Sequence, residues 1–124
     1  MCSATRQACS VYLKNLVYKS YSVDTIRRPD QTVIHESDRN ALKSSILPLL
    51  SASPSRSITL QLSHALKNVV ARDYPDNWPG LLDEVKRMLG SNEIREVASG
   101  CVATLEVVRA FRCALPILSC FCMY

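Results

Sequence analysis

The side chains best suited to covalent or metal chemistry in this 124-residue chain are its six cysteines and two histidines. A thiolate is a nucleophile and a metal ligand, and an imidazole can transfer a proton near neutral pH. Zinc needs paired ligands, yet Cys120 and Cys122 are one residue apart and no second pair accompanies them. Neither His35 nor His64 stands beside a Cys or Ser with an obvious role as a base, and there is no Ser–His–Asp set, P-loop or Gly-rich phosphate cradle. We therefore expect no enzyme activity, no metal and no cofactor.

Cysteine use and charge indicate a reduced compartment and an ordinary surface. Residues 1–10 contain no apolar signal segment, so we expect reduced thiols, with Cys9 and Cys101 on apolar helix faces. The net charge is +4 and the pI is near 8.8, but Lys and Arg are spread along the chain. This favours solvated surface charge over specific nucleic-acid binding. The apolar residues 113–124 are too few to span a bilayer and contain Pro116, so no membrane span is expected.

A short sequence repeats along the chain. Leu13–Val17 reads LKNLV, and Leu66–Val70 reads LKNVV; a weaker copy is Leu105–Val108. The second copy begins 53 residues after the first, and the third begins 39 residues after the second. Repetition at such spacing is typical of a stacked-helix solenoid, in which one repeat cannot bury its own apolar face. Solenoids are usually binding surfaces, so the functional question becomes which partner binds.

Hydrophobic periodicity predicts an all-α fold of about five helices, over residues 5–20, 36–51, 56–72, 79–89 and 92–111. One single helix followed by two helix pairs is typical of an α-solenoid of HEAT-type repeats, each of about 40–47 residues. We assign residues 1–112 to the repeats, 21–35 to a loop between helices, and 113–124 to an apolar tail outside the pattern.

Each predicted helix should bury one apolar face. We further expect Ser37 or a near neighbour to cap its helix, Pro48 to kink or end that helix, Asp83 to pair with Arg87, and Tyr74 and Trp78 to pack in the core. In chain order, the expected inward residues are Ala8, Cys9, Tyr12, Leu13, Leu16 and Val17; Leu42, Ile46, Leu49 and Leu50; Ile58, Leu62, Ala65, Leu66 and Val69; Leu81, Leu82, Val85, Met88 and Leu89; and Ile94, Val97, Ala98, Cys101, Leu105 and Val108.

Two segments resemble a known family. Arg6–Asn15 (RQACSVYLKN) resembles the R-Q-A-x-x-x-Y-L-K-N helix of the importin-β superfamily of nuclear transport receptors. Asp73–Leu82 (DYPDNWPGLL) is similar to the D-[YF]-P-x-x-W-P-x-L-L connection in the N-terminal part of the same receptors. With Glu36–Arg39 between them, these motifs resemble the branch that contains importin-seven and importin-eight, over residues 4–112.

The resemblance implies a non-enzymatic α-solenoid that binds the GTP form of a Ran-type small GTPase, carries protein cargo and touches Phe-Gly nucleoporins, in nucleus and cytoplasm. It also implies that the helices at 5–20, 56–72 and 92–111 line the concave face. The family begins with three more helices, is far longer and is usually acidic, so we expect a truncated product. The alternatives are an export receptor, a generic HEAT-repeat interaction scaffold or a non-functional gene product.

The repeat selects a candidate GTPase-binding surface. Equivalent positions on successive helices should align along one solvent-facing strip, namely Ser10, Lys14, Ser63, Lys67 and Glu106. The alternative is that these are ordinary solvated positions, since an isolated surface ion pair adds only about 0–1 kcal/mol. We expect Asn15 and Asn68 to be structural, with amides that bridge backbone groups of a neighbouring repeat.

Overall fold

The computed structural model describes residues 2–21 and 34–114, with side chains as far as Arg112. The helices are α1 (Ser3–Ser20), α2 (Glu36–Ser51), α3 (Arg56–Asp73), α4 (Leu81–Leu89) and α5 (Ile94–Ala114). No strand occurs in the described residues, so the all-α prediction is confirmed. α4 begins at Leu81 rather than at Pro79, and α5 continues past Phe111 into the predicted tail. Most of the predicted loop, residues 22–33, and the tail from residue 115 lie outside the described residues.

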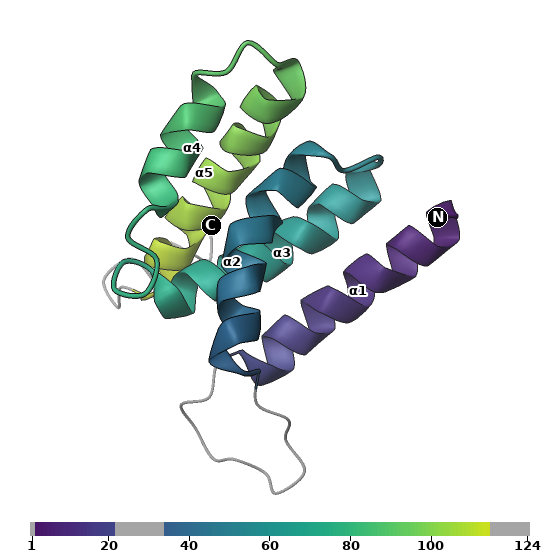
Figure 1. Cartoon of the computed structure of the whole chain (residues 1–124), viewed down its shortest axis with the longest axis horizontal. Helices are drawn as coiled ribbons and strands as arrows, with labels where there is room; N and C mark the ends of the chain where they lie inside the picture. The colour runs from purple at the N-terminus through teal and green to yellow at the C-terminus, as the bar shows by residue number, and fades with distance from the viewer. Residues whose placement is uncertain (1, 22–33, 115–124) are drawn as a thin grey trace, which may run out of the picture.

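The helices form two layers of a short stack (Figure 1). α1 packs against α3, and α3 packs against α5, so these three helices lie side by side. On the other side, α2 contacts α3 and α5, and α4 contacts α5. This arrangement of one single helix and two helical hairpins is the α-solenoid that the repeat predicts.

The central helix α3 supplies the middle of the core. Ala65, Leu66 and Val69 are fully buried, and Val70 is 1% exposed. All four belong to one packed hydrophobic cluster. Burying such a side chain contributes about 1.5–3 kcal/mol relative to leaving it exposed. All five inward positions predicted for this helix are confirmed: Ile58, Leu62, Ala65, Leu66 and Val69. Tyr74 and Trp78 also pack against the core as predicted.

Half of the predicted inward face of α1 is wrong. Val17 is buried and Leu13 and Leu16 are half-buried, as predicted, whereas Ala8, Cys9 and Tyr12 are exposed. Ser10 and Ser20 are buried although they were not predicted to be. α3 is the helix that packs against α1, so one side of α1 is covered and its second apolar side faces solvent. The predicted burial of the Cys9 thiol is therefore corrected, because Cys9 is an exposed free cysteine.

The predicted inward face of α5 is mostly wrong. Ile94 is 85% exposed, and Ala98, Cys101, Leu105 and Val108 are also exposed, whereas Val97 is half-buried. The buried face instead contains Ser99, Gly100, Ala103, Glu106, Val107 and Ala110. Small side chains on that face allow α2, α3 and α4 to approach closely; a Cβ on Gly100 would lie 3.1 Å from the Leu89 side chain.

Helix ends and single positions show smaller departures. Pro48 does not end α2, which continues to Ser51. The N-cap of α2 is His35, whose Nδ1 accepts the Ser37 N–H at 3.2 Å. Arg87 pairs with Glu84 rather than with Asp83. Three predicted core leucines near the edges of the stack are exposed, namely Leu49, Leu82 and Leu89.

Candidate protein-binding surface

A polar hollow lies between α1 and α3. α1 contributes Lys14, Asn15 and Tyr18, and α3 contributes His64 and Asn68; the cavity volume is about 320 Å³. Lys14 and Asn15 belong to the first copy of the repeated LKN sequence, and Asn68 belongs to the second. Side-by-side packing of α1 and α3 therefore turns a sequence repeat into one shared site.

The hollow contains hydrogen-bond donors from five different side chains. Lys14 supplies an ammonium, Asn15 and Asn68 supply amides, Tyr18 a phenol and His64 an imidazole. One N–H of Asn68 is already used, because its Nδ2 donates to the His64 carbonyl at 3.2 Å. Asn68 thus bonds its own helix, which corrects the expected bridge to a neighbouring repeat. None of the described residues that line the hollow is an Asp or Glu, so its chemistry suits an acceptor such as a carboxylate.

The five predicted surface residues divide into two groups. Lys14 lines the hollow, and Lys67 is half-buried one residue before Asn68. Ser10 and Ser63 are buried, and their hydroxyls donate to the carbonyls of Gln7 and Leu60 within their own helices. Their predicted solvent exposure is wrong, because the contact between α1 and α3 covers them.

The fifth predicted residue, Glu106, is also buried rather than solvent-facing. Only 3% of its surface is exposed, and Arg109 Nη1 donates to its Oε1 at 2.8 Å. Glu106 lies on the side of α5 that α2, α3 and α4 cover. Tyr18 and His64 also line the hollow but were not predicted from the sequence. The available signal was helical spacing, because Tyr18 lies four residues after Lys14 on α1 and His64 lies four residues before Asn68 on α3.

A buried polar cluster holds the α1 end of the surface in place. The Tyr21 hydroxyl donates to Asp73, and Lys43 Nζ lies 3.2 Å from Asp73 Oδ2. Lys43 also donates to the Asn77 carbonyl at 2.9 Å, and the Arg39 guanidinium lies 4.7 Å from the centre of the Tyr21 ring. Burial and the Asp73 carboxylate raise the pKa of the Tyr21 phenol above its usual value. The cluster joins the end of α1 to α2, to α3 and to the connection that leads to α4.

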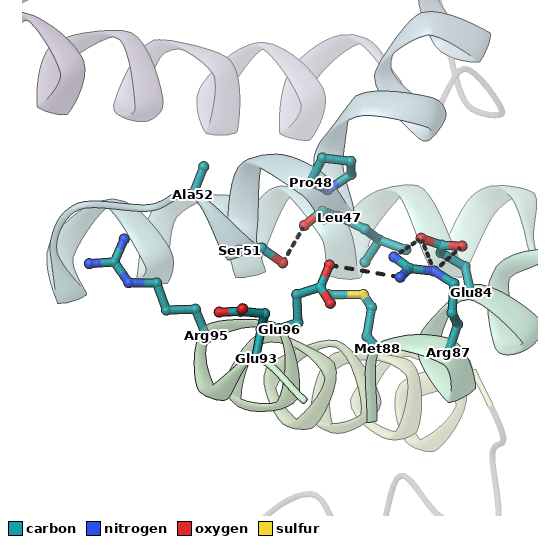
Figure 2. A pocket seen from close by; sticks show the side chains of 10 residues that line it. All are labelled: Leu47, Pro48, Ser51, Ala52, Glu84, Arg87, Met88, Glu93, Arg95 and Glu96. Atoms are coloured by element: carbon teal, nitrogen blue, oxygen red, sulfur yellow. Dashed lines mark hydrogen bonds and ion pairs between the residues drawn. The ribbon is translucent and has the colours of Figure 1, made fainter. Parts of the chain in front are cut away.

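A second hollow lies on the other side, between α2 and the α4–α5 hairpin (Figure 2). Its cavity volume is about 360 Å³. Its Arg87 donates to Glu84 at 2.7 Å and lies 3.7 Å from Glu96, as the dashed lines show. The hydrogen bond from Arg87 lowers the pKa of Glu84. Because these charges are paired with one another, this hollow is a contact region between helices, and it is a weaker candidate for ligand binding than the polar hollow between α1 and α3.

A third hollow, of about 410 Å³, is mainly apolar. It lies between α1 and the ends of α2 and α3 that face each other, and is lined in part by Cys9, Leu13, Leu49 and Leu62. Among the described residues, no group of three or more His, Cys, Asp or Glu side chains could hold a metal ion. No described helix is long and apolar enough to cross a membrane.

Known proteins that are similar in sequence to the chain include importins and an exportin. The Importin beta-like SAD2 homolog of Arabidopsis thaliana is 33% identical over 91 residues, which cover 73% of this chain and 8% of that protein. Importin-8 of Homo sapiens is 28% identical over 110 residues, covering 86% and 10% respectively. Exportin-2 of Drosophila melanogaster is 34% identical over 101 residues, covering 81% and 10%.

This chain spans 8–10% of the length of these three relatives. No protein-family model matches the chain. No solved structure gives a significant match to it.

Proposed function

Because the chain belongs to the importin-β superfamily of nuclear transport receptors, we propose that its α1–α3–α5 layer binds the GTP form of a Ran-type small GTPase and so supports protein import. The observation that carries this proposal is the polar hollow formed by equivalent residues of two successive repeats, Lys14, Asn15 and Asn68. A GTPase is a protein of fixed shape, and a surface built from repeated helices can contact it at regularly spaced points.

The function that we propose is non-enzymatic. In the complete receptor, we propose that protein cargo and Phe-Gly nucleoporins bind elsewhere, and that the protein moves between nucleus and cytoplasm. The Ser37 hydroxyl lies 2.8 Å from Nδ1 of His35, but this nitrogen also accepts the Ser37 N–H as the N-cap of α2, so we assign the contact to helix capping. Among the described residues, the exposed free thiols are Cys2, the N-cap residue of α1, Cys9 on α1 and Cys101 on α5.

The test is a pull-down of the whole chain with GTP-loaded and GDP-loaded Ran. We expect the chain to retain the GTP form, and Lys14→Glu to weaken retention because it reverses the charge at the hollow. The matched control is Lys86→Glu, which reverses an exposed lysine on α4, in the other layer. Equal retention of both nucleotide forms, or equal effects of the two substitutions, would contradict the assignment.

Export is the second candidate function, because Exportin-2 of Drosophila melanogaster is as similar in sequence as the importins. Importin-8 of Homo sapiens aligns over 110 residues at 28% identity and this Exportin-2 over 101 at 34%, so a transport assay decides between import and export. Proteins captured by the chain can be labelled and added with it to permeabilised cells. Their accumulation in nuclei supports import, and their loss from preloaded nuclei supports export.

A further inference from the structure

The two helices that form the polar hollow carry exposed charge of one sign. α1 contains Arg6, Lys14 and Lys19 and no Asp or Glu. α3 contains three basic residues, Arg56, Lys67 and Arg72, and its one carboxylate, Asp73, is buried and paired with Lys43. By contrast, α4 and α5 contain basic residues and carboxylates in nearly equal number, and their four carboxylates are Asp83, Glu84, Glu96 and Glu106. The net positive charge of the chain therefore lies mainly on α1 and α3.

Two of these basic residues lie in or beside the hollow. Lys19 and Arg72 each take part in another interaction, and Arg6 lines the apolar hollow instead, so we rely on Lys14 and Lys67. Lys14 lines the hollow itself, and Lys67 adjoins Asn68. A carboxylate in the hollow would gain an ammonium partner and neutral N–H and O–H donors, and each of its two oxygens can accept more than one hydrogen bond.

We propose that the hollow accepts a carboxylate side chain from an acidic segment of a protein partner, with Lys14 as the charged contact and the amides of Asn15 and Asn68 as hydrogen-bond donors. This inference goes beyond the proposed function, because it concerns the chemistry of the bound segment and applies whichever protein carries that segment. It also gives a role to the two helices that carry most of the net positive charge of the chain.

The surroundings of the hollow favour a protein over a nucleic acid. Leu60 is 53% exposed and lies one turn before His64 on α3, and Tyr18 at the hollow is 72% exposed. Exposed aliphatic and aromatic side chains beside cations are typical of protein interfaces, where they act as anchors. A nucleic-acid site relies instead on many cations that track the phosphates. Of the described residues that line this hollow, Lys14 is the one Lys or Arg.

The test uses the whole chain and a fluorescent peptide of alternating Glu and Leu, with a matched peptide in which every Glu is Gln. We expect anisotropy to report binding of the Glu peptide only, weakening as salt rises because exposed charges are screened over about 10 Å at 0.1 M. Lys14→Gln should weaken binding by about two- to fivefold, as for a partly exposed ion pair, whereas Lys14→Arg should retain most of it. The control is Lys86→Gln on α4, which should have no effect.

A second measurement locates the peptide. The side-chain amide signals of Asn15 and Asn68 should shift in NMR spectra when the Glu peptide is added. Circular dichroism of each variant reports whether it is folded. Equal binding of the Glu and Gln peptides, or unshifted amide signals, overturns the proposal.

A single-stranded oligonucleotide serves as the competing probe. If it binds more tightly than the Glu peptide and is equally sensitive to Lys14→Gln, the site is a nucleic-acid site and the proposal is overturned. The Ran pull-down is an independent result. A chain that binds the Glu peptide but not Ran keeps this inference and refutes the GTPase proposal, and the reverse pattern does the opposite.

Discussion

Replacing Asp73 with alanine should be among the most destabilising single changes in this chain. The side chains of Lys43 and Asp73 are only 8% and 4% exposed, and their charged atoms are 3.2 Å apart. The Asp73 carboxylate also accepts a hydrogen bond from the hydroxyl of Tyr21, which is 1% exposed. Asp73→Ala therefore leaves a buried ammonium without its counter-charge and a buried phenol without its acceptor.

The expected cost follows from the partners that remain. Breaking a buried ion pair by removing one partner typically costs about 3–5 kcal/mol. Lys43 keeps one acceptor, the Asn77 carbonyl at 2.9 Å, so we place the loss near the lower end, at about 3 kcal/mol. The free energy of unfolding of a small domain is about 5–15 kcal/mol, so this loss removes a large part of it.

The assay is urea unfolding followed by circular dichroism. With a slope of about 1–3 kcal/mol per molar urea, the midpoint should fall by about 1–3 M. The matched control, Asp83→Ala, removes an exposed carboxylate from α4 and should change stability by less than about 0.5 kcal/mol. The double change Lys43→Met with Asp73→Ala should cost less than the sum of the single changes, by about 0.5–3 kcal/mol, because it leaves no unpaired ammonium.

Two results would refute this reasoning. If Asp73→Ala costs no more than Asp83→Ala, the carboxylate is not a buried counter-charge. If the two single changes add without coupling in the double variant, Lys43 and Asp73 do not stabilise the fold as a pair.

Three further predictions concern other parts of the stack. Because the folded state raises the pKa of Tyr21, folding favours the neutral phenol, and this stabilising contribution is complete below the unfolded pKa of about 10. The contribution is lost as pH rises further, so the free energy of unfolding should fall above pH 10. Tyr21→Phe, which removes the titrating phenol, should flatten that fall. Ser55 Oγ accepts the Ile58 N–H at 3.3 Å as the N-cap of α3, so Ser55→Ala should cost about 1 kcal/mol in urea unfolding, while Ser55→Asp should retain most of the stability. Leu105 is exposed on α5, so Leu105→Glu should leave stability within about 0.5 kcal/mol of the parent but lower self-association measured by light scattering; a loss of several kcal/mol would show that Leu105 is buried.

Helix positions were predictable because periodicity and turn signals are local. The bounds of α2 match the prediction at both ends, since acidic residues in its first turn precede the apolar stripe and the turn residues Ser53 and Pro54 follow it. Pro48 does not end the helix: Pro48 and Ser44, whose carbonyl the missing N–H would bond, are both exposed, so water can satisfy that carbonyl. Local sequence thus specifies where a helix forms more reliably than it specifies what the helix touches.

The buried cluster was not predicted, although the sequence contains a signal for it. Asp73 continues the buried stripe of Leu62, Leu66 and Val69, and Lys43 continues the stripe of Ile46 and Leu50. A charged residue that falls on a buried stripe needs a partner, because an unpaired buried charge is costly. Two such residues of opposite sign therefore indicate a buried pair, and Tyr21 was the missing third member.

The errors at α1 and α5 have one physical cause. α3 has neighbours of its own layer on both sides, so every apolar position along its stripe is covered and the predicted face is right. Among the described helices, α1 contacts α3 only, and within its layer α5 has α3 on one side. Each of these helices has two faces with apolar or small residues, and periodicity alone cannot distinguish the face that packs from the face that remains exposed.

The exposed face of α5 shows how strong this ambiguity is. Ile94, Ala98, Cys101, Leu105 and Val108 follow the i, i+4, i+7 spacing of a packed helix stripe, yet all are exposed. The face that packs contains Ser99, Ala103 and Glu106. It is the buried face because its small residues let three helices approach and because Arg109 compensates the charge of Glu106. Where two faces compete, close approach of helix backbones therefore decides burial over the hydrophobicity of single side chains.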